Sequence, residues 1–200
     1  MVRQWLCFWL AVHDVGKFAL TFQGLRSDLL ERLQRRSATS LAYTIRHDTL
    51  GDFLWKDAFV RRLDPLTLDS ARARWKGAFS PWVAAVTGHH GQPPAVQAIF
   101  RDQHFKPVDE HAAAAFVRCA RDLMLPGDVL DRVLALGPEK VREAGTRGSW
   151  WLAGLAVLSD WIGSNTEWFP YDADTCSLSE YWAKAVDRAT RAVDQSGGLP

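Results

Sequence analysis

Apolar and polar residues follow one another along the chain with the spacing of amphipathic helices. Apolar residues recur about every 3.6 positions between Leu41 and Val60, and Ser80-Pro81 is a strong helix start. No stretch shows the strict alternation, bounded by turn dipeptides, that is typical of strands. The pattern predicts an all-α protein with helices at residues 3–14, 28–34, 41–64 (broken near Gly51), 80–88, 111–125, 128–136, 150–162 and 179–195.

One predicted helix is apolar on nearly every side. Residues 150–162 are interrupted only by Ser159 and Asp160, and a helix that is apolar all round is usually central and buried. We therefore expect Ser149 to cap a buried helix. The tryptophans of this segment are then expected in the core: Trp150, Trp151 and Trp161.

The composition of the chain indicates a single globular domain. With 200 residues, 48% of them hydrophobic and 24% charged, the chain has the composition of one globular domain. We assign this domain to residues 1–195 and treat residues 196–200 as a tail. A domain of this size folds without a structural metal or disulfides. The net charge of +1 gives no sign of a tight nucleic-acid binder or of a membrane-surface protein.

Two further features indicate the cellular location. The three cysteines are widely spaced and form no CxxC pair, which is typical of a reducing compartment. The apolar stretch at residues 5–12 is shorter than the about 20 residues of a membrane span and lacks the features of a signal peptide. We therefore expect a cytoplasmic protein that does not contact a membrane.

Candidate metal ligands interrupt the apolar helices in small polar clusters. An unpaired buried carboxylate costs several kcal/mol, so Asp160 needs a partner, and a bound cation explains it best. Imidazole and carboxylate ligands together suit Mn, Fe, Zn, Ni or Co, and also Mg. Taken singly, each such residue is more often an ordinary core residue. The clusters are His13-Asp14, His47, His89-His90 and Asp160.

The order of these clusters resembles a known family. His13-Asp14-Val15-Gly16-Lys17 has the HDxGK form of the HD superfamily of metal-dependent phosphohydrolases. The whole set resembles the HD nuclease domain of the CRISPR-associated helicase-nuclease of type I interference systems, and its last element resembles the type I-E branch. The remaining elements are Phe22-Gln23, Arg46-His47, Gly88 to Gly91, Leu158 to Ser164, and Trp168 to Tyr171.

The resemblance implies an HD-domain helical bundle with up to two divalent ions, among Mn, Ni, Co, Fe and Mg. Asp14 would join the two metals, and Lys17 would lie close to the substrate phosphate. His13 and Asp160 would bind the first metal. The second metal would be bound by His47, His89 and His90.

The resemblance also implies a substrate and partners. The expected activity is metal-dependent cleavage of single-stranded DNA in CRISPR interference, an antiviral defence, together with a helicase module and an RNA-guided surveillance complex. The chain has no GxxxxGK[ST] loop, so we do not expect ATP hydrolysis by a P-loop mechanism. Two alternatives are an HD phosphohydrolase of nucleotides and a metal-deficient module that docks the helicase or the surveillance complex.

The chain departs from the family pattern in one respect. Family members carry a further metal-ligand histidine well upstream of the HD pair, whereas the 12 residues before His13 contain none. A shortened chain, a helix supplied by a partner, or a weakly held first metal would each explain this. Loss of the helix that carries this histidine would expose apolar residues and reduce activity. The residues concerned are Trp5, Phe8 and Trp9.

Weaker signals concern the surface. Residues 64–78 and 143–148 are basic and contain glycine, which predicts mobile, ligand-facing loops. Trp75 or Phe79 would stack on bases, and Ser164 and Asn165 would line the cleft, whereas His104 and His111 are expected to be structural or at the surface. Basic residues could follow a DNA backbone or be ordinary surface charge: Arg35, Arg36, Arg46, Arg61, Arg62, Arg72, Arg74 and Lys76.

Overall fold

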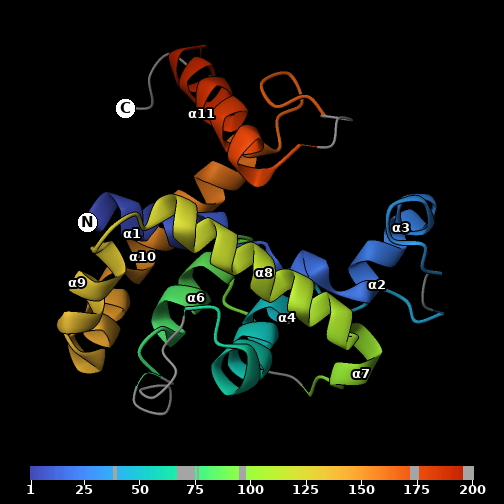
Figure 1. The fold of residues 1–200 in the computed structure, drawn as a ribbon, viewed down its shortest axis with the longest axis horizontal. Helices are drawn as coiled ribbons and strands as arrows, with labels where there is room; N and C mark the ends of the chain where they lie inside the picture. Colours follow the sequence, from blue (N-terminus) through green and yellow to red (C-terminus); the bar gives the residue numbers. More distant parts are fainter. Residues whose placement is uncertain (38–39, 67–74, 76, 95–97, 172–175, 196–200) are drawn as a thin grey trace.

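The fold is entirely helical, as the sequence predicts. The computed structural model describes residues 1–37, 40–66, 75, 77–94, 98–171 and 176–195, and no strand occurs in these ranges. Its elements are α1 (Val2–Ala11), η1 (Val15–Phe18), α2 (Leu20–Gln23), η2 (Gly24–Arg26), α3 (Ser27–Gln34), α4 (His47–Leu54), the π-helical η3 (Trp55–Leu63), α6 (Ser80–Thr87), α7 (Arg101–His104), α8 (Pro107–Met124), α9 (Val129–Ala135), α10 (Pro138–Gly163) and α11 (Leu178–Gln195) (Figure 1).

The helices pack around α1. Helix α1 contacts α6, α8 and α10, while α8 also covers η1 and η3. Helix α11 extends away from this bundle, as Figure 1 shows. Among the described residues no helix combines the length and the hydropathy that a membrane crossing requires.

Aromatic residues of α1 form the centre of the core. Trp5, Phe8 and Trp9 are 4%, 0% and 0% exposed. The ring of Trp9 lies 5.0 Å from that of Trp55 and 6.2 Å from that of Trp82. The expectation that these α1 residues are exposed is wrong, because α6, α8 and α10 enclose the helix.

Helices α6 and α10 approach closely because one helix presents a glycine. A Cβ at Gly145 would lie 2.5 Å from Nε1 of Trp82, and this Nε1 donates a hydrogen bond to the carbonyl of Val141 at 2.9 Å. The contact, made near the start of α6, fixes this helix and the following His89 and His90 relative to α10, which carries Asp160.

The boundaries and burial of α10 correct two predictions. The helix begins at Pro138, after Gly137, rather than at Ser149, so residues 143–148 are helical and not a loop. The predicted tryptophan core is also wrong, since α10 buries a stripe of smaller residues: Val141, Gly145, Leu152 and Ala156. The tryptophans are on the outside, 87%, 81% and 73% exposed at Trp150, Trp151 and Trp161.

The predicted long helix at 41–64 is also shorter than expected. Residues 41–46 are not helical, and α4 begins at His47, so this histidine stands at a helix start and not inside a helix. The predicted break near Gly51 is absent, because α4 runs through Gly51 to Leu54 and continues directly as η3 from Trp55. Most of the predicted loop at 64–78, with Arg72, Arg74 and Lys76, lies outside the described residues, as does the predicted tail at 196–200.

Buried ion pairs account for part of the predicted basic surface. Glu110 is 2% exposed and is bound by two arginines, with Arg101 Nε 2.6 Å from Oε1 and Arg62 Nη2 3.0 Å from the same oxygen. Arg36 likewise donates to Asp109 at 2.5 Å. Burial opposes ionisation of Glu110, but the two arginines outweigh it and lower the pKa of this carboxyl below its ordinary value of 4.5.

We predict that Glu110→Gln lowers the free energy of unfolding by about 1.5–3 kcal/mol at neutral pH, the range for hydrogen bonds to charged groups. A lowered pKa in the folded state stabilises the fold above pH 4.5, and this stabilisation is lost as the pH falls further. Urea unfolding at neutral pH and below pH 4.5 measures the difference, with the exposed Glu31→Gln as control. A difference that does not shrink in acid would contradict the account.

Candidate metal centre

The His-Asp pair lies in a tight turn between α1 and η1. Helix α1 ends at Ala11, and His13 and Asp14 follow before η1 begins at Val15. The amide of Lys17 donates to the carbonyl of Asp14 at 2.9 Å, and the side chain of Gln23 donates to the carbonyl of Lys17 at 2.6 Å. These bonds hold the turn, so that both side chains project from it in fixed directions.

A glycine lets a second backbone segment reach this turn. A Cβ at Gly16 would lie 1.8 Å from the carbonyl oxygen of His47 and 2.5 Å from the amide nitrogen of Gly51. No side chain larger than hydrogen fits in that space. The glycine of the HDxGK sequence therefore serves the crossing of η1 and α4, which brings His47 beside Asp14.

Backbone carbonyls orient two of the histidine rings. Nδ1 of His13 lies 2.6 Å from the carbonyl of Leu10, and Nδ1 of His89 lies 3.0 Å from that of Val86. A carbonyl only accepts hydrogen bonds, so Nδ1 carries the proton in both rings. The lone pair is then on Nε2, the nitrogen that faces the site, as metal ligation requires.

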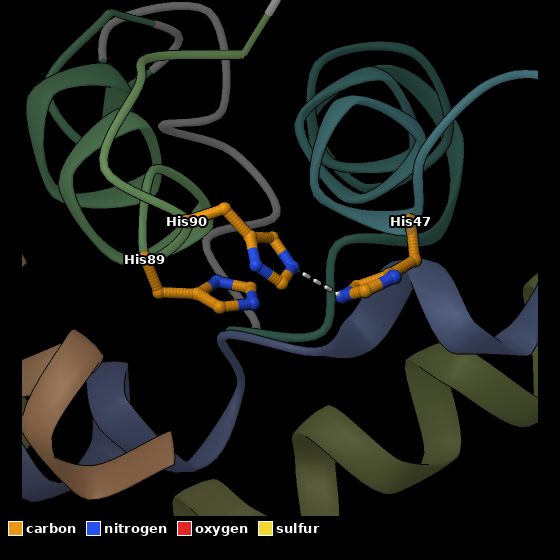
Figure 2. A group of neighbouring side chains, drawn as sticks. All are labelled: His47, His89 and His90. Atoms are coloured by element: carbon orange, nitrogen blue, oxygen red, sulfur yellow. Dashed lines mark hydrogen bonds between the residues drawn. The ribbon is translucent and has the colours of Figure 1, made fainter. Parts of the chain in front are cut away.

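The histidines and the late aspartate form two groups of metal donors. His47, His89 and His90 form one group, and His13, His89 and Asp160 form the other. Within each group the donor atoms all lie within 4.8 Å of one another. Figure 2 shows the first group, with the imidazoles of His47 and His90 turned toward each other and their Nε2 atoms 3.1 Å apart.

Asp14 lies between the two groups. Its Oδ1 is 3.1 Å from Nε2 of His47 and 3.6 Å from Nε2 of His89. Its Oδ2 is 3.2 Å from Nε2 of His13 and 2.5 Å from Nζ of Lys17. The two carboxylate oxygens thus face different donor sets, an arrangement in which one carboxylate can serve two ions.

The electrostatics favour the protonation states that bind a cation. Burial opposes ionisation of Asp14, but its contacts with His13, His47 and Lys17 hold the pKa of this carboxyl well below its usual range. Burial lowers the pKa of His89. Burial, together with the nearby Arg46, also lowers the pKa of His90.

His13 behaves differently. Burial opposes its protonation, but the contact with Asp14 raises the pKa of His13 above its ordinary value. A cation at His13 therefore competes with a proton more than it does at His89 and His90, whose pKa values are lowered.

Unpaired buried atoms show that a cation fits this site. Nε2 of His13, Nε2 of His89 and Oδ1 of Asp14 are buried without a hydrogen-bond partner. Unpaired buried polar groups are rare in proteins and call for an explanation, such as an ion. Because all three are nitrogen or carboxylate donors that face one another, the residues present suit Mn, Fe, Co, Ni, Zn or Mg.

The structure brings together all six metal ligands predicted from the sequence, and Lys17 beside them. It also places Ser164 3.5 Å from Oδ1 of Asp160. His104 is buried and bonded to Thr21 at 3.1 Å, while His111 is exposed. Sequence reasoning missed Tyr43, whose hydroxyl lies 3.0 Å from Nδ1 of His47. Its position four residues before His47 was the one available signal.

The predicted aromatic stacking platform for bases is wrong. Trp75 and Phe79 are 6% and 3% exposed and stack on each other with ring centroids 5.4 Å apart. Arg46 is different, since its side chain is 58% exposed while it pairs with Asp48 at 3.2 Å. Arg46 therefore provides exposed positive charge one residue from His47.

This helical fold, with histidines gathered around a His-Asp pair, is that of the HD class, a family of metal-dependent hydrolases. A profile of the family described as "Cas3, HD domain" matches residues 1–169. The chain belongs to this family of Cas3 HD domains, which are CRISPR-associated HD nucleases. Helix α11 lies beyond the matched residues.

Two further comparisons give a curated relative and a structure of similar fold. The CRISPR-associated endonuclease/helicase Cas3 of Escherichia coli (strain K12) is 29% identical over 213 residues, which cover 98% of the chain and 24% of that protein. The chain thus spans about a quarter of the length of this relative. A solved structure described as that of a CRISPR-associated protein matches 98% of the chain, and 21% of its own, with a TM-score of 0.70 and 24% identity, which supports the fold.

We predict that Gly16→Ala lowers the free energy of unfolding by about 3 kcal/mol or more, the upper end of the range for overpacked cores. The added methyl group would overlap the backbone of α4, which cannot shift without moving the whole helix. The substitution should also weaken metal binding by displacing His47. Urea unfolding and metal titration measure both effects.

The matched control is Gly154→Ala in α10, where nothing lies within 4 Å of an added Cβ. This variant should gain about 0.5–1 kcal/mol of stability, as glycine-to-alanine changes do within helices. Equal effects of the two substitutions would contradict the close crossing of η1 and α4.

Proposed function

We propose that this chain is a two-metal nuclease domain that cleaves single-stranded DNA in CRISPR interference. In this proposal it works in the cytoplasm with a helicase module and an RNA-guided surveillance complex. The observation that carries the proposal is the position of Asp14, whose Oδ1 faces His47 and His89 and whose Oδ2 faces His13. Membership of the Cas3 HD family supports DNA as the substrate.

The residues divide the work of phosphodiester hydrolysis. His13 and Asp160 would hold one ion, and His47, His89 and His90 the other, with Asp14 between them. Two divalent ions supply a hydroxide nucleophile at neutral pH and stabilise charge on the phosphate. Lys17, whose side chain is 39% exposed and bound to Asp14, adds positive charge at the solvent side of the site.

The exposure of the site favours a polymer over a small nucleotide. The side chains of Asp14 and Asp160 are 23% and 22% exposed, and His90 is exposed. A small-molecule pocket normally encloses most of its ligand, whereas a passing strand needs an open site. The exposed side chain of Arg46 is suited to contact a phosphate of such a strand.

Cleavage assays with matched substrates test the proposal. The purified chain, supplied with Mn²⁺ and separately with a chelator, is incubated with single-stranded DNA, duplex DNA, single-stranded RNA and cyclic nucleotides. Metal-dependent cleavage of single-stranded DNA above the others supports the proposal. Hydrolysis of nucleotides alone would replace it with the nucleotide phosphohydrolase, and metal-free protein without any activity would favour the docking module.

Asp14→Ala should abolish cleavage. The rate should fall by more than the roughly 10–100-fold that is typical when a residue that only orients a metal ligand is removed. The fold should survive, because Asp14 lies between α1 and η1 and is not a buried core residue, so the substitution removes polar contacts of the site and no core packing. Metal titration, circular dichroism and cleavage rates are compared with Asp102→Ala, which removes a carboxylate that is 88% exposed. Retained cleavage in Asp14→Ala would contradict the assignment.

Lys17→Ala should lower kcat by about 10²–10³-fold, the range for removal of one group that stabilises transition-state charge. Metal affinity should change less, because the protonated amine of Lys17 has no lone pair to bind a metal ion. Lys56→Ala is the control, since this lysine of η3 also pairs with an aspartate, at 2.7 Å, but its side chain is 56% exposed and lies outside the donor groups. An unchanged kcat would remove Lys17 from the reaction.

A further inference from the structure

Tyr43 lies beside the metal-donor group without belonging to it. The residue precedes α4 and is half-buried. Its ring packs edge-on against Phe22, with centroids 5.4 Å apart, and Phe22 also packs against the ring of His47 at 5.5 Å. Phe22 therefore holds Tyr43 and His47 against the same surface.

The hydroxyl of Tyr43 makes two contacts with the same histidine. It accepts a hydrogen bond from the backbone amide of His47 at 2.6 Å, and it lies 3.0 Å from Nδ1 of the same ring. The first bond satisfies one of the amides that a helix start leaves without a partner. It also ties the tyrosine to the first residue of α4, so hydroxyl and ring move together.

The chemistry of the ring decides the direction of the second contact when a cation is bound. Nε2 of His47 faces Oδ1 of Asp14 and Nε2 of His90, so it is the nitrogen that would bind the ion. A neutral imidazole that donates its Nε2 lone pair carries its proton on Nδ1. That proton then points to the Tyr43 oxygen, as backbone carbonyls receive the Nδ1 protons of His13 and His89.

We propose that Tyr43 is a positioning residue for the second metal: its oxygen accepts the Nδ1 proton of His47 and so directs the Nε2 lone pair of that ring into the site. The inference depends on the proposed two-metal site. Tyr43 touches neither the substrate nor the ions and acts only through His47. Partners of this kind typically change metal affinity by about 10–100-fold.

Tyr43→Phe tests the proposal, because it removes the oxygen and keeps the ring that packs on Phe22. Calorimetric titration with Mn²⁺ alone should show one equivalent weakened about 10–100-fold and the other little changed. In the His47→Ala background the same substitution should have no further effect on Mn²⁺ binding, since the ring through which Tyr43 acts is absent. Tyr171→Phe, at a tyrosine that is 94% exposed, is the matched control.

A second measurement needs no substitution. Nitrogen NMR of the imidazoles in the wild-type, Zn²⁺-loaded chain should show a proton on Nδ1 of His47 and the metal on Nε2. The reverse assignment would overturn the proposal even if Tyr43→Phe did not fold.

The outcomes separate this inference from the proposed function. Normal binding of both equivalents by Tyr43→Phe, or a loss that persists in the His47→Ala background, would overturn the role of Tyr43 and leave the two-metal site standing. Failure of the wild-type chain to bind Mn²⁺ would overturn both.

Discussion

The site depends on one close contact between backbones, the crossing of η1 and α4 at Gly16. A side chain there would overlap the carbonyl of His47, so only glycine lets the histidine stand beside Asp14. The other ligands come from more distant segments, and a second glycine contact, Gly145 against Trp82, sets the distance between α6 and α10. Two glycines, which have no side chain to block the close contacts, thus allow residues up to 147 positions apart in the sequence to meet.

Charge and tautomer follow from this geometry. Asp14 is held ionised by two histidines and a lysine, and carbonyl groups fix the Nδ1 protons of His13 and His89. As a result, several lone pairs converge on a space where protein donors do not satisfy them. Such an arrangement is costly for a folded protein unless a cation completes it. The same residues raise the free energy of the folded protein without metal and lower it when a metal ion is bound.

Much of the site could be predicted from the sequence, because its ligands break apolar helices in a recognisable order. The helical class followed from periodicity, and the Ser80-Pro81 start of α6 from a local signal. The start of α10 at Pro138 was missed because its first turns are polar, while its apolar second half suggested burial. Apolar residues alone do not indicate which side of a helix is covered, and α10 packs through Gly145 and Ala156 rather than through its tryptophans. The role of Tyr43 arises in a non-helical segment, where periodicity carries no information.

The central claim is that one carboxylate, Asp14, serves two ions. Crystals grown with Mn²⁺ and measured at wavelengths on both sides of the manganese absorption edge would test it most directly. The account predicts two anomalous peaks about 3.5–4 Å apart, the spacing of two-metal sites, with one oxygen of Asp14 directed at each peak or one oxygen shared between them. A single peak, or no peak among these histidines, would contradict the account.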